Sequence, residues 1–375
     1  MTKLFPVDLA AARMLAARAT MLSALAVAIG ALPSGAAAQP ATPFLPMPSQ
    51  TVSTVPSNGD VNPYGVAFVP RGFPTDGTLQ PLDLLVSNFN NSQNLQGTGT
   101  TIVRVDGHGN STLFFQGQPG LGLTAALGIL RAGFVVVGNL PTSDGTSATV
   151  QPGSLLFIDR NGRLVGSIAN TQLVNGPWGL AIHDEGSTAQ IFVANVLSGA
   201  VNRLDFSLTR ETVQFLDAVQ VASGYNHRPD AAALLLGPSG LSYDANLDLL
   251  YVASSADNAI YAVPNAGASG NMSGVGALVY QDLNHLHGPI DLATAPNGDL
   301  IAANSDGSNA DPKQPSELVE FTPQGGFVTE SSLDPNNGGA FGVAVMPFSF
   351  SGVTLVRSAA VDDNQNTVTI SWTVN

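Results

Sequence analysis

The sequence predicts an all-β protein, specifically a six-bladed β-propeller of four-stranded antiparallel blades whose last blade is closed by the N-terminal strand. Three observations support this prediction. A unit of roughly 45 to 60 residues recurs six times. Only 11% of the 375 residues are charged, and 40 Gly and 25 Pro separate short apolar runs, as in chains with many tight turns. No segment has the pattern of a long helix.

The first 38 residues have the features of an export signal. Basic residues precede a short apolar run that starts at Met21, and Ala36 and Ala38 provide small residues at the cleavage positions. We expect cleavage after Ala38 and export to the periplasm or the medium. A membrane anchor is the alternative, but the apolar run of about 12 residues is shorter than the roughly 20 needed to span a bilayer.

Charge and cysteine content exclude several classes of function. Without the predicted signal, 10 basic and 26 acidic residues remain, a formal net charge of −16. Such a charge repels nucleic acids and anionic lipid surfaces. The absence of Cys excludes disulfides, thiolate metal sites and a cysteine nucleophile. We expect a monomer without a membrane span.

Each repeat begins with a similar strand and a turn. The six first strands read NPYGVAF from Asn62, TAALGIL from Thr124, GPWGLAI from Gly176, GPSGLSY from Gly237, GPIDLAT from Gly288 and GAFGVAV from Gly339. A second apolar strand follows in every repeat, and a third and usually a fourth strand come after it. Four-stranded sheets with apolar faces must pack on one another, and a closed ring achieves this without long edges.

The sixth repeat lacks its last strand, whereas an unassigned extended segment, residues 50–56, precedes the first repeat. We therefore expect residues 50–56 to provide the outer strand of the last blade. The chain then divides into the signal (1–38), a linker (39–49) and one propeller domain (50–375). An open solenoid is the alternative, and the absence of polar capping repeats argues against it.

The pattern GPxGL…LLYVAS…DNAIYAV, seen from Gly237 onward, resembles the NHL repeat of six-bladed propellers. It is also similar to the wider group of gluconolactonase-like, strictosidine-synthase-like and paraoxonase-like propellers. The resemblance covers essentially the whole predicted domain and implies a six-bladed fold. It leaves function open, because these propellers include hydrolases, lyases and binding scaffolds. The Glu that binds metal in gluconolactonase-like proteins has no counterpart in the strand around Gly65.

One end of the propeller is predicted to hold the ligand site. First strands begin and second strands end at this upper face, and the long insertions 89–100, 140–153, 219–237 and 305–316 fall largely there. The second strands end at Asn88, Asn139, Asn195, Ser254, Asn304 and Asp362. Neutral oxygens in a ring suit Ca²⁺ or a polyhydroxylated ligand. We expect the first five to bind ligand, and Asp362 with Asn195 and Asn304 to bind metal. Alternatively, each Asn satisfies backbone groups of its own turn.

The fifth repeat departs from the others. Its first strand has Asp291 where the other repeats have Gly or Ala, and His287 lies four residues earlier. A His and a carboxylate on one channel wall could act as general base and orienter, or both could ligate a metal. They are the predicted catalytic pair. Alternatively, Asp291 is bonded to neighbouring backbone amides in a water-lined channel.

These features favour an exported, non-catalytic binding propeller with a small molecule, a glycan or a protein as ligand on the upper face. The alternative is a Ca²⁺-dependent hydrolase, lactonase or lyase with its site in the central channel. The missing family carboxylate favours the first function, and the pair of Asp291 and His287 favours the second.

Overall fold

The computed structural model describes residues 3–4, 42–45, 49–268, 270–311, 313, 316–336, 338–350 and 352–374. The predicted signal peptide lies outside the described residues except for β1 (Lys3–Leu4), which pairs in parallel with the edge of one sheet. Within the described part of the chain, no helix has the length and hydrophobicity needed to cross a bilayer.

The first half of the chain forms three antiparallel sheets of consecutive strands. Sheet 1 contains β3 (Val61–Phe68), β4 (Leu84–Asn90), β5 (Thr101–Val105) and β6 (Ser111–Gln116). Sheet 2 contains β7 (Leu123–Leu130), β8 (Phe134–Asn139), β9 (Ser154–Asp159) and β10 (Leu164–Ile168), with β1 beside β10. Sheet 3 contains β11 (Pro177–Asp184), β12 (Thr188–Asn195), β13 (Ala200–Leu208) and β14 (Val213–Ser223).

The second half repeats this arrangement after a short hairpin of β15 (Arg228–Asp230) and β16 (Leu234–Leu236). Sheet 4 contains β17 (Pro238–Asp244), β18 (Leu249–Ser254), β19 (Ala259–Pro264) and β20 (Ala277–Tyr280). Sheet 5 contains β21 (Pro289–Thr294), β22 (Leu300–Asn304), β23 (Ser316–Phe321) and β24 (Phe327–Asp334). Sheet 6 contains β25 (Ala340–Phe350), β26 (Val353–Asp362), β27 (Thr367–Val374) and β2 (Ser49–Ser53).

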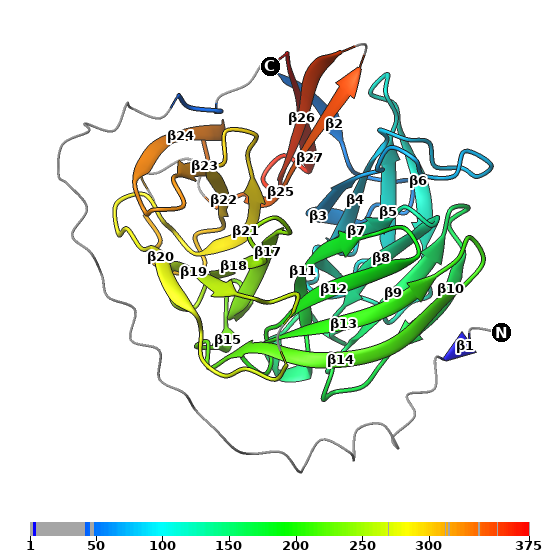
Figure 1. Ribbon diagram of the computed structural model, residues 1–375, viewed down its shortest axis with the longest axis horizontal. Helices are drawn as coiled ribbons and strands as arrows, with labels where there is room; N and C mark the ends of the chain where they lie inside the picture. The colour runs from blue at the N-terminus through cyan, green and yellow to red at the C-terminus, as the bar shows by residue number, and fades with distance from the viewer. Residues whose placement is uncertain are drawn as a thin grey trace.

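The sheets are arranged as a ring (Figure 1), and we use the term central channel for the region enclosed by their innermost strands, which has a cavity at each end. The first strand of each sheet is innermost, and each innermost strand contacts the next, from β3 through β7, β11, β17, β21 and β25 back to β3. Among the described residues the only helical element is the short 3-10 turn η2 (Ser147–Thr149). The predicted all-β propeller of antiparallel four-stranded sheets is thus confirmed.

The two ends of the domain meet in sheet 6. Strand β2 pairs antiparallel with β27, so that Ser49 lies opposite Ser371 and Val52 opposite Val368. Beyond the strand, the backbone N–H of Thr54 donates to Asn366 O at 3.0 Å. The segment expected to complete the last sheet from the N-terminal side therefore does so, although the strand covers only 49–53.

Glycine on the innermost strands lets neighbouring sheets approach closely. A Cβ atom on Gly240 would lie 2.3 Å from Cα of Asp291, and one on Gly179 would lie 2.1 Å from the carbonyl oxygen of Ser239. Both distances are shorter than atomic contact permits. The recurring Gly of the sequence repeat is therefore required by the narrow centre of the ring.

Candidate functional site

Asn side chains at the ends of three second strands form hydrogen bonds with the segment that precedes the first strand of the same sheet. In three sheets an Asn side-chain oxygen accepts a backbone N–H: Asn139 from Gly122 at 2.8 Å, Asn195 from Asn175 at 2.7 Å, and Asn304 from His287 at 3.0 Å. Each of the three Asn residues is buried. These oxygens are used within their own sheets, which agrees with the alternative that the sequence left open.

Two of the other predicted ring residues, Asn88 and Ser254, donate to nearby groups, whereas the Oδ1 atoms of Asn88 and Asp362 are buried without a hydrogen-bond partner. The Asn88 side chain donates to Thr54 O at 3.0 Å, and the Ser254 hydroxyl donates to Asp257 at 2.6 Å. Burial raises the pKa of Asp362 to about 6, and the nearby Asp334 carboxylate adds to the rise. No group of three or more His, Asp or Glu side chains within the described ranges is arranged to hold a metal ion. The side-chain oxygens of Asn195 and Asn304 are already used by backbone N–H groups, and the proposed metal site of Asp362, Asn195 and Asn304 stays a prediction.

His287 is buried and faces backbone carbonyls. Its Nδ1 lies 2.5 Å from Asn309 O and its Nε2 lies 3.3 Å from Asn284 O. The neighbouring Glu317 is also buried, and its carboxylate accepts a hydrogen bond from Asn304 Nδ2 at 3.0 Å. Burial raises the pKa of Glu317 to about 7. His287 therefore holds together the loops above sheet 5.

Asp291 lies on the channel wall and bonds to two backbone amides. Its carboxylate accepts from Leu292 N and from Val343 N of the next sheet, both at 2.9 Å. Burial raises the pKa of this carboxyl to about 7, although both hydrogen bonds oppose the rise. The ring nitrogens of His287 and the oxygens of Asp291 thus bond to different backbone groups, and the predicted catalytic pair is not joined.

A polar cavity of about 300 Å³ lies at the upper mouth of the channel. Residues from sheets 1, 5 and 6 line it: Asn62, Tyr64, Asn90, Asn94, Gln96, Ile290, Ser305, Asp306, Gly307, Gly338, Phe341 and Asp363, together with Ala232 and Ala233 of the hairpin. Three of the four insertions predicted for this face contribute to the lining. The cavity is thus where sequence topology placed the ligand site, with other residues around it.

Two residues that line this cavity each have a buried amide oxygen without a hydrogen-bond partner. The Oδ1 atoms of Asn62 and Asn90 are buried and make no hydrogen bond, and the two residues are 6% and 2% exposed. A buried polar atom without a partner is costly and rare in folded proteins. Asn62 also has a left-handed backbone, with φ of 60°. Both features indicate a binding site, where such costs are commonly found.

Two carboxylates contribute charge to the same cavity. Burial raises the pKa of Asp363 to about 6, and the adjacent Asp362 adds to the rise. Asp306 lines the cavity from sheet 5 and has a left-handed backbone, with φ of 53°. The cavity therefore combines neutral oxygens with acidic groups, one of which changes charge near pH 6.

Aromatic rings form the floor of the cavity, and two loops cross above it. The Tyr64 ring stacks on Phe89 at 4.8 Å and contacts Phe341 at 4.7 Å. Above them, Gln96 Nε2 donates to Ala232 O at 2.7 Å, which links the β4–β5 loop to the hairpin. The cavity is therefore enclosed on two sides.

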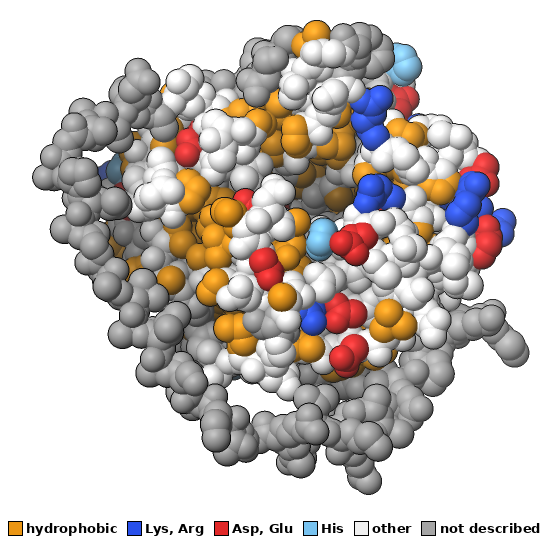
Figure 2. All heavy atoms as spheres, in the orientation of Figure 1, with side chains coloured by type: hydrophobic (Ala, Val, Ile, Leu, Met, Phe, Trp, Pro, Cys, Tyr) orange, Lys and Arg blue, Asp and Glu red, His pale blue; other side chains and the backbone are white. Residues whose placement is uncertain are grey.

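The lower end of the channel differs chemically. A cavity of about 520 Å³ there is lined largely by aliphatic side chains, including Val66, Leu292 and Val345. Figure 2 shows one face of the ring, where hydrophobic side chains border a recess near the middle. Polar side chains such as Ser242, Asp244 and Asn246 also line this lower cavity, but they form a smaller share of its lining residues than at the upper mouth.

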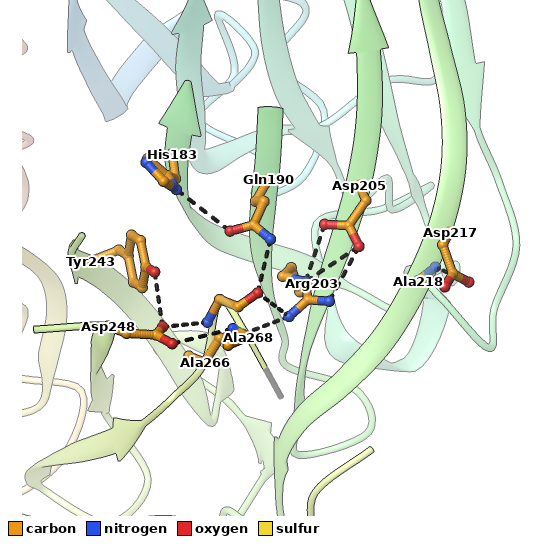
Figure 3. Close-up of polar contacts among 11 residues, drawn as sticks. His183, Gln190, Arg203, Asp205, Asp217, Ala218, Tyr243, Asp248, Ala266 and Ala268 are labelled. Carbon is orange, nitrogen blue, oxygen red and sulfur yellow. Dashed lines mark hydrogen bonds and ion pairs between the residues drawn. The ribbon is translucent and has the colours of Figure 1, made fainter. Parts of the chain in front are cut away.

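A second polar cluster joins sheets 3 and 4 (Figure 3). The Arg203 guanidinium pairs with Asp205 at 3.1 Å and donates to Ala266 O at 2.9 Å. Asp248 accepts from the Tyr243 hydroxyl at 2.9 Å. These groups satisfy one another, so we assign the cluster a structural role.

The sequence repeat does not distinguish Asn62, Asn90, Asp306 or Asp363 as site residues. They lie at the start of a first strand, at the end of a second strand, or in loops that follow second strands, and none repeats in every unit. The Asp362–Asp363 pair was the signal that could have identified one of them, because two adjacent acids interrupt an otherwise apolar repeat.

Comparisons with known proteins identify the fold. No protein-family model matches the sequence, and no curated protein is a significant match. Among solved structures, the chain is similar to one described as a putative gluconolactonase (13% identity, 88% of this chain and 94% of that chain, TM-score 0.50). It is also similar to a putative oxidoreductase (glucose dehydrogenase) from Thermus thermophilus (13% identity, 87% and 100%, TM-score 0.51). Regucalcin, a calcium-binding protein from Agrobacterium tumefaciens, has 11% identity (85% and 93%, TM-score 0.47).

Proposed function

We propose that this protein hydrolyses a lactone or ester of a small polyhydroxylated molecule at the upper mouth of the channel. The observation that carries the proposal is the convergence, in the lining of one cavity, of Asp306 and Asp363 with Asn62 and Asn90, whose buried amide oxygens have no hydrogen-bond partner. Two similar structures with TM-scores of at least 0.50 are described by names that refer to gluconolactone and glucose. Those descriptions support a sugar-derived substrate.

The chemistry of the cavity fits a calcium ion. Ca²⁺ prefers carboxylate and neutral carbonyl oxygens, which Asp306, Asn62 and Asn90 supply. The absence of His from the lining makes the donor set unlike that of a zinc site. When bound, calcium would polarise the carbonyl of the substrate.

The remaining side chains have defined roles in this proposal. Asp363, ionised above about pH 6, takes a proton from water as the water oxygen adds to the carbonyl carbon. The C–O bond to the leaving oxygen then breaks, and Asp363 returns the proton to that oxygen. Tyr64 and Phe341 offer flat apolar faces to the sugar ring, while Gln96 and Asn94 can bind its hydroxyls.

The test compares two neighbouring carboxyl groups by pH-stat assay on aldonolactones. We expect Asp363→Asn to lower kcat at least 100-fold, within the range typical of a lost general base. Asp362→Asn, the matched control, removes a charge that raises the pKa of Asp363. It should keep kcat and shift the acidic limb of the rate profile, near pH 6, to lower pH.

If neither variant loses activity, the assignment of Asp363 as the general base is wrong. If the wild type binds sugars or Ca²⁺ by calorimetry but hydrolyses none of the lactones, the non-catalytic binding propeller replaces the hydrolase.

We also propose that sheets 1 to 6 are the six blades of one closed propeller and that the β15–β16 hairpin is an insertion. The continuous ring of innermost strands supports this arrangement. The hairpin has two strands and lies between the last strand of sheet 3 and the first strand of sheet 4. An experimental structure with a different number of four-stranded sheets would disprove it.

A further inference from the structure

Glu320, on β23, is fully buried and has no basic partner among the described residues. Its carboxylate instead accepts the backbone N–H groups of two consecutive residues far away in sequence. Phe44 N lies 2.8 and 2.9 Å from the two oxygens, and Leu45 N lies 2.8 Å from Oε2. Backbone N–H groups of an N-terminal segment therefore supply hydrogen bonds to this buried carboxyl group, which also forms a side-chain hydrogen bond with the neighbouring Asp299.

The same segment is fixed at two further points. Asn297 Nδ2 donates to Thr42 O at 3.1 Å and to Glu320 Oε1 at 3.0 Å, so one amide bridges the segment and the carboxylate. The Leu45 side chain is 8% exposed and packs into the apolar cluster around the channel. Backbone and side chain of the segment are thus both recognised.

Leu45 borders a cleft of about 250 Å³ between sheets 5 and 6. Hydroxyl groups cover much of its lining: Ser49, Thr51, Ser331, Ser332, Ser358, Thr369 and Ser371. Small hydroxylated side chains leave room that the neighbouring sheets do not fill. The cleft is therefore continuous with the place where residues 42–45 are bound.

We propose that this junction is a peptide-binding groove whose occupant is residues 42–45 of the same chain. The groove selects an extended segment with two successive free N–H groups and a leucine at the second of these positions. A buried carboxylate that loses its hydrogen bonds is strongly destabilising, because charge is then left without compensation. The groove thus depends on its peptide, and an identical segment from a second copy could occupy it only when the first is displaced.

The first test keeps the full chain and prevents its own segment from docking. A Phe44→Pro/Leu45→Asp double variant removes one N–H and places a carboxylate where the Leu45 side chain packs into the apolar cluster. We expect a lower Tm, and we expect a synthetic peptide with the sequence of residues 41–49 to bind and to restore the Tm. The same peptide methylated on the Phe44 and Leu45 nitrogens should do neither. Equal binding of both peptides, or an unchanged Tm of the variant, would overturn the proposal.

A second test applies if that variant does not fold. Glu320→Gln retains the shape of the side chain but replaces one acceptor with an amide donor, which should release the segment. Chymotrypsin should then cleave after Phe44 at least 10-fold faster than in wild type, whereas the Leu45–Pro46 bond is not a substrate because proline follows it. Glu317→Gln, on the same strand and also buried, should leave the cleavage rate unchanged. Equal cleavage rates in the two variants would contradict the role of Glu320.

Discussion

The junction between sheets 5 and 6 differs from the other five junctions of the ring. Each of those five is filled by its own cluster of buried apolar side chains, as between sheets 2 and 3, where Phe157 contacts Phe206 with ring centroids 5.4 Å apart. Between sheets 5 and 6, apolar packing is confined to the cluster near the channel, and a cleft remains farther out. Close packing of neighbouring sheets is thus not required at every junction for the ring to close.

The alternation of side chains along the strands explains the difference. On β27, Val368 and Ile370 face sheet 1, whereas Thr369 and Ser371 face sheet 5. Successive residues of a strand point to opposite faces, so the sequence TVTIS gives sheet 6 one apolar face and one hydroxylated face. The apolar area missing on the second face is partly replaced by Leu45 and by the hydrogen bonds to Glu320.

The largest expected effect follows from removing Ser49–Ser53. This deletion takes Val52 out of the junction between sheets 6 and 1 and leaves β27 as an open edge. We expect a loss of several kcal/mol from a total stability that is typically about 5–15 kcal/mol, or aggregation. Urea denaturation and size-exclusion chromatography would measure both. A monomer with unchanged stability would show that sheet 6 does not need its outer strand.

Truncating a side chain at a filled junction should cost more than truncating one at the cleft. Phe157→Ala removes a fully buried ring and should destabilise by about 3–5 kcal/mol. Leu333→Ala, beside the cleft, should cost less than about 2 kcal/mol, because the side chain is only partly buried. Chemical denaturation would measure both changes. Equal losses would mean that the cleft is as well packed as the other junctions.

Adding volume should have opposite effects at the two kinds of junction. Ala302→Val, in the cluster between sheets 4 and 5, should destabilise by about 1–3 kcal/mol through overpacking. Ala360→Val, which extends into the cleft, should be neutral or stabilising by up to about 1 kcal/mol. Thermal unfolding of both variants measures the difference. Destabilisation of similar size in both would argue that the cleft cannot accept a larger side chain.

A smaller effect concerns pH. The folded state raises the pKa of Asp291 and Glu317 to about 7 and that of Asp362 and Asp363 to about 6, chiefly by burial. Between the unfolded pKa values, near 4, and these folded values, the folded state holds more protons, so stability falls as pH rises. We expect the Tm to decrease by a few degrees from pH 5 to pH 8.

Glu317→Gln tests the origin of that pH dependence. The amide oxygen can still accept from Asn304, and the group no longer titrates. The variant should therefore match wild type at pH 5, exceed its Tm at pH 8, and flatten the profile. An unchanged profile would remove Glu317 from the groups that cause the dependence.

Much of the fold could be predicted from the sequence because the same steric and turn constraints apply in each sheet and therefore produce a repeated pattern of residues. The Gly of the first strands, such as Gly240, is required by the close approach of neighbouring strands. The unassigned segment near residue 50 indicated how the ring closes. The β15–β16 hairpin was expected only as an insertion, because Leu234 and Leu235 of β16 pack into the channel cluster through contacts that no local pattern encodes.

The candidate site could be predicted only as a location. Asn139, Asn195 and Asn304 recur because, in each of these repeats, a backbone N–H group before the first strand needs an acceptor. The residues that stand out in the repeat are therefore structural. Asn62, Asn90 and Asp363 come from different repeat positions and meet only when the ring closes. Their burial and missing partners are properties of the three-dimensional packing. The same holds for Glu320, whose partners lie 275 and 276 residues away.

Strand β2 also determines when this chain can finish folding. Thr51 and Thr369 face each other across sheet 6 although they are 318 residues apart in sequence. During synthesis the first strand of the domain must wait for the last strand to be made before it can pair. Until then, sheet 6 has no outer strand and one side of sheet 1 has no apolar neighbour. Closing so long a loop is entropically costly and slow. We therefore expect the final step of folding to be late, cooperative and dependent on the C-terminal strand.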